Sequence, residues 1–228
     1  MTDERPRRLS ESNRVEAFSD GVFSIAITLL VLELAVPTFS GSFGSQLVGE
    51  WVSYVAYLAA FGNIGVLWMG HHTVFTRIAA VDSGLLWRNL VLLLTVSVVP
   101  FPTAVIASAF RNGTSADQAA AVLAYAIVGM ASGVAWTLLF GYLRRRPDLL
   151  DENVDVRFFR LSETLVTFVG YGIAGLIGWL ASPAIALGIF LVFPILYVLR
   201  VRSEGAGAAA LAGPGSSGVS RSGTTPRP

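Results

Sequence analysis

The stretch FSDGVFSIAITLLVLELAV, residues 18–36, decides the fold class of this chain of 228 residues. It is apolar or weakly polar except for two acids, Asp20 near its start and Glu33 near its end. A helix from Arg14 to Val36 would be about 34 Å long at about 1.5 Å per residue. A bilayer core of about 30 Å needs about 20 such residues. The stretch therefore predicts a transmembrane helix that begins near Arg14.

Five further stretches have the same character, so the sequence predicts six transmembrane helices. Their boundaries are Phe18–Val36, Trp51–Gly70, Leu85–Phe110, Gln118–Leu143, Phe158–Leu180 and Pro183–Leu199. The chain is 54% hydrophobic and only 14% charged, whereas soluble domains are about a quarter charged. The alternating segments of a membrane β-barrel do not occur. We therefore expect an all-α integral membrane protein, with the lipid bilayer as its surroundings, rather than a soluble helical bundle.

The distribution of positive charge orients these helices. All sixteen basic residues are arginines, and only Arg111 falls on the far side when the N-terminus is placed in the cytoplasm. Because cytoplasmic loops carry the excess of basic residues, we expect both termini in the cytoplasm and the protein in the plasma membrane. We expect a cytoplasmic tail at 1–13, a six-helix membrane domain at 14–200 and a disordered cytoplasmic tail at 201–228. The net charge of +1 gives no reason to expect a nucleic-acid partner.

Polar residues at the cytoplasmic ends of the first three helices form a candidate site. Asp20 lies near the hydrocarbon boundary, where a carboxylate is costly unless it is paired. Buried polar groups need hydrogen-bond partners. The expected cluster consists of Arg14, Ser19 and Asp20 with one of His71 and His72, and Asn89. A solvated helix end is the alternative environment for Asp20. His71 and His72 point about 100° apart on a helix, so we expect no metal site from them.

The first helix also carries an apolar stripe. At about 100° per residue, one face holds Gly21, Ile25, Thr28, Leu29 and Leu32. Asp20 lies about 100–150° away from this stripe, so we expect the acid to look toward other helices of the same chain. Lipid and the protein core are the ordinary environments of such a stripe.

The pattern Arg14-x-x-x-Phe18-Ser19-Asp20-Gly21 resembles the signature of the transmembrane protein 175 family of potassium channels. The likeness continues to Glu33, and it includes Leu67-Trp68-x-x-His71-His72 and Trp87-Arg88-Asn89 in the next two helices. The resemblance implies a homotetramer whose first helices line a central pore for potassium ions. It implies no cofactor and no fixed metal ion.

The resemblance also implies roles for single residues. Members of this family have a constriction of apolar side chains in place of a carbonyl filter, and the matching residues are Ile25, Leu29 and Leu32. Ser24 and Thr28 would supply hydroxyls nearby, although Ser24 lies about 80° or more off the stripe. A packing network that fixes the pore helix would consist of Arg14, Phe18, Ser19, Asp20, His71, His72 and Asn89.

The string Val169-Gly170-Tyr171-Gly172 copies most of the carbonyl filter of ordinary potassium channels. A filter needs extended backbone that is protected inside a pore. This string lies within the fifth hydrophobic stretch, so we expect it to be a glycine-rich packing surface of a helix.

The alternative function is a proton-coupled secondary transporter. Asp20 with His71 or His72 would form its proton relay. Pro100 and Pro102 favour it, because they can break the third helix and transporters use broken helices. A membrane enzyme is the least expected class, since the sequence lacks a nucleophile and base at chemical spacing.

Overall fold

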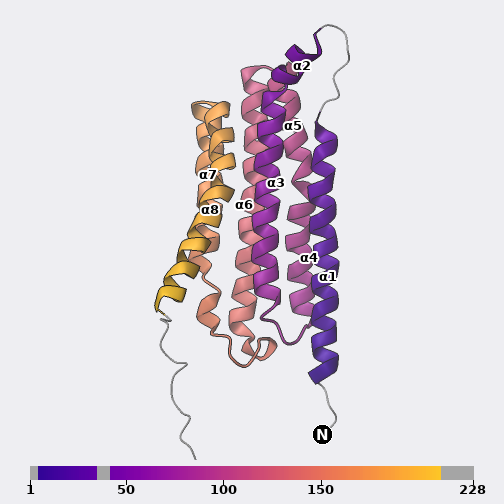
Figure 1. Ribbon diagram of the computed structural model, residues 1–228, viewed down its shortest axis with the longest axis vertical. Helices are drawn as coiled ribbons and strands as arrows, with labels where there is room; N and C mark the ends of the chain where they lie inside the picture. The colour runs from indigo at the N-terminus through magenta and orange to yellow at the C-terminus, as the bar shows by residue number, and fades with distance from the viewer. Residues whose placement is uncertain (1–4, 35–41, 212–228) are drawn as a thin grey trace, which may run out of the picture.

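The computed structural model describes residues 5–34 and 42–211, which form an elongated bundle of helices (Figure 1). The helices are α1 Arg5–Leu29, α2 Phe43–Gly49, α3 Trp51–Phe75, α4 Ser83–Val98, α5 Pro100–Asn112, α6 Ser115–Arg145, α7 Leu161–Leu180 and α8 Pro183–Leu211. Three short 3-10 turns are η1 Leu30–Glu33, η2 Pro147–Leu149 and η3 Val156–Phe158. The predicted all-helical class is therefore confirmed over the described residues.

Five helical segments of the described chain are long and apolar enough to cross a bilayer. They are Ser12–Glu33, Trp51–Phe75, Ser83–Asn112, Ser115–Arg145 and Val156–Leu180. The sixth predicted segment is part of α8, whose apolar stretch over Pro183–Leu196 is shorter than the other five. Five of the predicted crossings are thus supported by length and composition, and the sixth stays a prediction.

The first and last helices extend beyond their predicted boundaries. α1 begins at Arg5 rather than near Arg14. Pro6 falls in its first turn, where the missing N–H of proline is tolerated. α8 continues as far as Leu211 through an alanine-rich run, and alanine has the highest helix propensity. The tail that we expected to be disordered is therefore helical up to that residue, and the remainder lies outside the described residues.

α4 and α5 form one path with a break at Val99. Pro100 and Pro102 have no N–H, so the regular helical hydrogen bonds cannot continue through this point. The N–H of Val99 instead bonds to the carbonyl of Val96 at 3.1 Å. The path keeps its general direction (Figure 1), so the prolines produce a break within one crossing.

α6 and α7 pack closely because glycines leave room at their contact. Gly129 lies directly against the ring of Tyr171, and a Cβ atom on Gly175 would lie 2.6 Å from the Cβ atom of Ala126. Small residues at helix contacts allow the close approach that drives packing in lipid. Gly129 of α6 and Gly175 of α7 therefore let α7, at the side of the bundle, pack closely on α6 (Figure 1).

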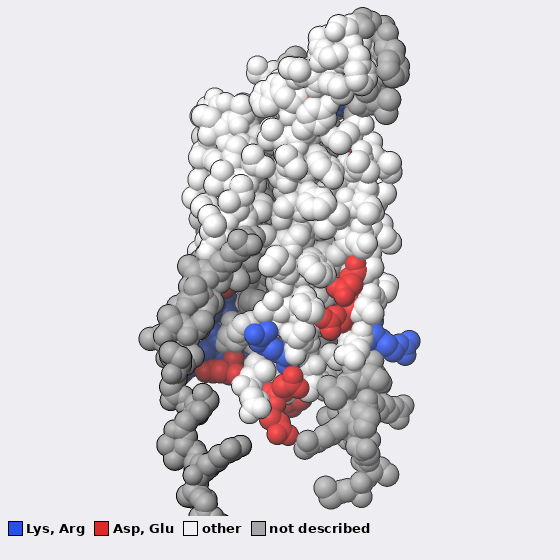
Figure 2. All heavy atoms as spheres, viewed as in Figure 1, with Lys and Arg blue, Asp and Glu red and all other residues white. Residues whose placement is uncertain are grey.

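Charged side chains gather at one end of the bundle, the lower end of Figures 1 and 2, which we call the charged end. Both ends of the described chain lie there (Figure 1). At the opposite end Arg111 donates to Glu50 across 2.9 Å and ties the end of α5 to the start of α3. The separation of charge gives the bundle two chemically different ends.

Two loops close the charged end by pairing with each other. Ile78, after α3, forms an antiparallel bridge with Leu150, after α6. The N–H of Asp151 donates to the carbonyl of Arg77 at 3.1 Å. The buried hydroxyl of Ser12 donates to the carbonyl of Ile78 at 3.0 Å. The lower part of α1 is thereby fastened to loops from both halves of the chain.

Candidate functional site: the two faces of α1

α1 has a buried face and an exposed face. The buried face, which packs toward α3 and α4, holds Ser19, Phe23 and Ala26 of α1, and Leu30 of η1, the turn that continues it. The exposed face leaves Ile25 61% and Leu29 42% accessible, and Leu32 of η1 74%. Gly21 and Thr28 are exposed with them. The whole predicted stripe thus points away from the core of its own chain. It is available for contacts outside this chain.

Two hydroxyl groups lie on the exposed part of α1. The Oγ1 atom of Thr28 lies 3.0 Å from the carbonyl of Ser24 and 2.9 Å from that of Ile25. Its proton is therefore used within the helix, while its lone pairs stay open to the exposed side. Ser24 is also exposed. Thr28 lies on the apolar stripe, and Ser24 is exposed beside it.

A buried hydrogen-bonded chain joins α1, α3 and α4. The Nε2 atom of His71 lies 2.9 Å from the Oδ1 atom of Asn89. The Nδ2 atom of Asn89 donates to the Oγ atom of Ser19 at 2.9 Å, and Ser19 donates to the carbonyl of Val15 at 2.8 Å. Since an amide oxygen only accepts, His71 donates through Nε2. Ser19, His71 and Asn89 are buried, so each bond offsets part of a desolvation cost.

Aromatic rings enclose His71. Its ring stacks on Phe75 with centroids 4.1 Å apart and meets Phe23 of α1 at 5.3 Å. The Nδ1 atom has no hydrogen-bond partner among the described residues. A proton on Nδ1 would be an unpaired buried donor. This environment favours the neutral imidazole that donates from Nε2.

The acids of α1 contact α3 at a more exposed level. Trp68 donates from Nε1 to the Oδ1 atom of Asp20 at 2.9 Å. The Nδ1 atom of His72 lies 2.8 Å from the Oε1 atom of Glu16. The pairs are one helical turn apart on both helices. Asp20 thus meets an indole rather than a histidine or Arg14, and the polar groups form two sets instead of the single cluster that we expected.

The other predicted members of the network lie on the surface. Phe18 and Arg14 are exposed, and Arg14 makes no ion pair within the described part of the chain. The contacts of Glu16 and Trp68 were not predicted from the sequence. The sequence did contain a pattern that could have predicted these contacts. Glu16 with Asp20, and Trp68 with His72, are spaced i, i+4, which puts each pair on one helix face.

The filter-like string over residues 169–172 is helical throughout, inside α7. Tyr171 is buried, and its hydroxyl donates to the Oδ1 atom of Asn63 at 2.8 Å. Gly170 lies against the ring of Phe193 in α8. A helical segment cannot present the row of backbone carbonyls that a filter requires. The string serves helix packing, as the sequence predicted.

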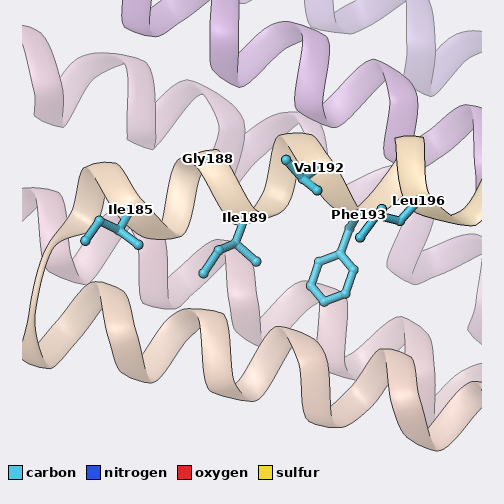
Figure 3. Close-up of a pocket in the computed structure, with 6 residues that line it drawn as sticks. All are labelled: Ile185, Gly188, Ile189, Val192, Phe193 and Leu196. Atoms are coloured by element: carbon cyan, nitrogen blue, oxygen red, sulfur yellow. The ribbon is translucent and has the colours of Figure 1, made fainter.

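α8 carries a shallow apolar groove with a volume of about 360 Å³. Figure 3 shows that several of its side chains point toward the neighbouring helix. It is lined by Ile185, Gly188, Ile189, Val192, Phe193 and Leu196. None of these side chains offers a polar atom to an ion. Within the described ranges, no three His, Cys, Asp or Glu side chains are grouped to hold a metal ion either.

The chain is similar to several known proteins. Residues 14–100 match the family model described as endosomal/lysosomal potassium channel TMEM175. A potassium channel of Streptomyces collinus is 45% identical over 149 residues, which are 64% of this chain and 71% of that protein. A potassium channel of Chamaesiphon minutus is 35% identical over 202 residues, which are 84% of this chain and 95% of that protein.

A solved structure extends the likeness to the fold. The crystal structure of a lysosomal potassium-selective channel TMEM175 homolog from Chamaesiphon minutus has a TM-score of 0.73 and 32% identity. The match covers 84% of this chain and 98% of that chain. The residues matched by the family model include most of α1, all of α3 and all of α4, the helices that carry Ser19, His71 and Asn89.

Proposed function

This chain belongs to the TMEM175 family, and we propose that it forms a potassium-permeable ion channel whose pore is lined by α1. The observation that carries the proposal is the exposed stripe of Ile25, Leu29 and Leu32, on a helix long and apolar enough to cross a membrane. Two relatives matched over more than two thirds of their length are named potassium channels. Their names describe ion channels and not enzymes.

The pore belongs to an assembly rather than to one chain. A single helix exposes one stripe and cannot surround an aqueous path, whereas a closed ring of identical subunits brings the same stripe from every copy to a shared axis. We propose a homotetramer in the plasma membrane, with six crossings per chain and both termini in the cytoplasm. The placing of both described chain ends at the charged end supports this arrangement.

Ile25, Leu29 and Leu32 form the constriction of the proposed pore. Rings of apolar side chains restrict hydrated ions and can gate a channel by dewetting. The open lone pairs of Thr28 give an ion an acceptor beside these rings, and Ser24 supplies a second hydroxyl close by. This makes the constriction apolar in its walls and polar at intervals along its length.

The network around α1 positions the constriction. The Ser19–Asn89–His71 chain and the Phe23 contact fix the rotation of α1 about its own axis, and this rotation decides which side chains reach the pore. Asp20 with Trp68, and Glu16 with His72, fasten the charged end of α1 to α3. These residues orient the pore helix and do not touch the ion. Arg14 and Phe18, both exposed, belong to the surface that neighbouring subunits share.

Ion flux from purified protein in liposomes tests the proposal. We expect a passive potassium flux that follows the applied voltage and does not require a proton gradient. Saturable transport that depends on a proton gradient would contradict the channel and support the proton-coupled transporter.

The substitution Asp20→Asn separates the two functions further. It keeps an acceptor for the Trp68 indole and removes the titratable carboxyl group. The channel proposal expects an assembled protein with passive flux. A relay through Asp20 and His71 or His72 predicts an assembled protein that has lost its transport.

A further inference from the structure

The arginines of the charged end whose side chains the structure describes fall into a paired group and an unpaired group. The paired group consists of Arg77, stacked on Phe158 at 4.2 Å, Arg88, stacked on Tyr142 at 4.0 Å, and Arg146, bonded to Asp82 and Asp148 at 2.8 Å each. These three guanidinium groups are already used in holding helices and loops together. They are therefore not the groups that would meet a partner.

Arg14 on α1 is unpaired as well among the described residues, and the remaining unpaired group, at the end of α6 and just before α7, consists of Arg144, Arg145, Arg157 and Arg160, which we call the open arginine cluster. All four are exposed. Within the described chain the first three make no ion pair, and Arg160 reaches only Glu163, at 3.9 Å. The Arg160 side chain stays 63% accessible in spite of that contact. Three of these guanidinium groups are therefore open to an external partner, and the fourth is only loosely paired.

The open arginine cluster lies at the level where the membrane begins. α7 starts at Leu161, directly after Arg160, and its 20 residues span about 30 Å, the thickness of the hydrocarbon core. The buried ring of Phe159 packs edge-to-face on Phe140 of α6 at 5.4 Å. This contact holds the segment before α7 beside the end of α6, which carries Arg144 and Arg145.

An exposed apolar surface continues from the cluster along α7. Its members repeat at helical spacing, and the large exposed side chains are Leu165, Val166, Val169, Ile173, Leu176, Trp179 and Leu180. Trp179 lies near the opposite end, and tryptophan prefers the membrane interface. The face of α7 thus offers cations at one boundary and an unbroken apolar strip toward the other. An anionic phospholipid matches this surface, because its negative headgroup would meet the arginines and its acyl chains would lie along the apolar strip.

We propose that the open arginine cluster binds the headgroups of anionic phospholipids, whose acyl chains lie along the exposed face of α7. Guanidinium groups form paired hydrogen bonds with phosphate oxygens, and basic clusters beside a membrane helix favour anionic lipids. The apolar strip beside the cluster selects a lipid over a soluble anion. At the opposite end of the bundle Arg111 already forms an ion pair with Glu50. We therefore expect the preference for anionic lipids only at the charged end.

Native mass spectrometry of the delipidated full-length protein tests this inference. The protein is titrated with phosphatidylglycerol or phosphatidylcholine of identical acyl chains. We expect the wild type to prefer phosphatidylglycerol, and R157Q and R160Q each to lower that preference about fivefold. R111Q removes the same charge at the opposite end and is the matched control, with an unchanged preference.

The wild type alone gives a second measurement that does not depend on the folding of any variant. Binding of phosphatidylglycerol should weaken as salt is raised from low to high concentration, because the interaction is between charges, while binding of phosphatidylcholine should stay constant. Equal affinity for the two lipids, an equal effect of R111Q, or complete displacement by millimolar inorganic phosphate would each overturn the inference. None of these readouts requires ion conduction.

Discussion

Asn89 of α4 joins α3 and α1 to its own helix through two hydrogen bonds, one with His71 and one with Ser19. Asn89→Ala leaves His71 Nε2 without an acceptor and Ser19 without its donor in a buried site. Leaving a buried polar group unpaired costs about 1–3 kcal/mol. We expect a clear fall in the thermal stability of the detergent-purified protein. Asn13→Ala, at an exposed position of the same helix bundle, is the control and should unfold like the wild type.

Ile25 is the residue through which the pore proposal can be tested most directly. Ile25→Asn replaces the apolar ring by a polar one, so the ring should be wetted, conductance should rise, and the preference for potassium over sodium should fall. Bilayer recordings measure both. Ile173→Asn makes the same change at an isoleucine of α7 that is also exposed, and it should leave selectivity unaltered.

Thr28 tests the hydroxyl beside these rings. Thr28→Val keeps the shape of the side chain and removes the oxygen, so potassium preference should fall with little change in pore width. An unchanged preference in this variant and in Ile25→Asn, together with a large change on substitution of Val169, would contradict the assignment of the pore to α1.

At the scale of the element, the contact between α6 and α7 depends on particular glycines. Gly175→Ala would put a Cβ atom 2.6 Å from that of Ala126, and overpacking of this kind costs about 1–3 kcal/mol. Gly172→Ala is the matched control on the same helix, because its Cβ atom would make an ordinary 3.6 Å contact with Met130. Thermal unfolding should show destabilisation of the first variant only. Equal stability of the two would contradict this packing.

Asp82, the residue that caps the start of α4, should make the stability of the folded protein depend on pH. Burial raises the pKa of Asp82, but hydrogen bonds from Tyr142 and from the Leu85 backbone, with the charge of Arg146, outweigh burial and bring the pKa below the ordinary 3.8. A lowered carboxyl pKa stabilises the folded state above the ordinary value, and this contribution disappears as the pH falls through the folded value.

We therefore expect Asp82→Asn to flatten the loss of thermal stability of the detergent-purified protein between about pH 5 and pH 2. The exposed Asp151, on the neighbouring loop, provides the comparison. Asp151→Asn should keep the slope of the wild type, and a flattening of equal size in both variants would mean that the Asp82 contact does not carry the effect.

At the scale of the whole molecule, the proposed pore requires several chains. We expect native mass spectrometry in mild detergent to give four times the chain mass of 24.3 kDa. A monomer, or a stable dimer that still conducts potassium, would contradict the proposed ring. Ile25→Asn should preserve the assembly, since in the proposed ring it changes a side chain that faces the axis.

The positions of the helices and the stripe on α1 could be predicted from the sequence, because both depend on local patterns: apolar runs and a repeat of 3.6 residues. The hydrogen-bond partner of Asp20 could not be predicted. This partner depends on the rotation of α3 about its own axis, which turns Trp68 toward Asp20 and His71 into the core. Adjacent residues on a helix differ in direction by about 100°, so the sequence did not show which of the two histidines would be buried. The start of α1 at Arg5 was missed because its residues carry no apolar signal, only the propensity to continue a helix.

The gathering of charge at one end of the bundle has an electrical consequence. In the proposed ring all copies insert in one orientation, so the two mouths of the pore differ: one is surrounded by arginines and acids, and the other, over the described residues, chiefly by uncharged side chains (Figure 2). Ions that approach from the two sides therefore meet different potentials before they reach the constriction. With the same salt on both sides, voltages of equal size and opposite sign should drive unequal currents, and a charged blocker should act from one side more strongly than from the other.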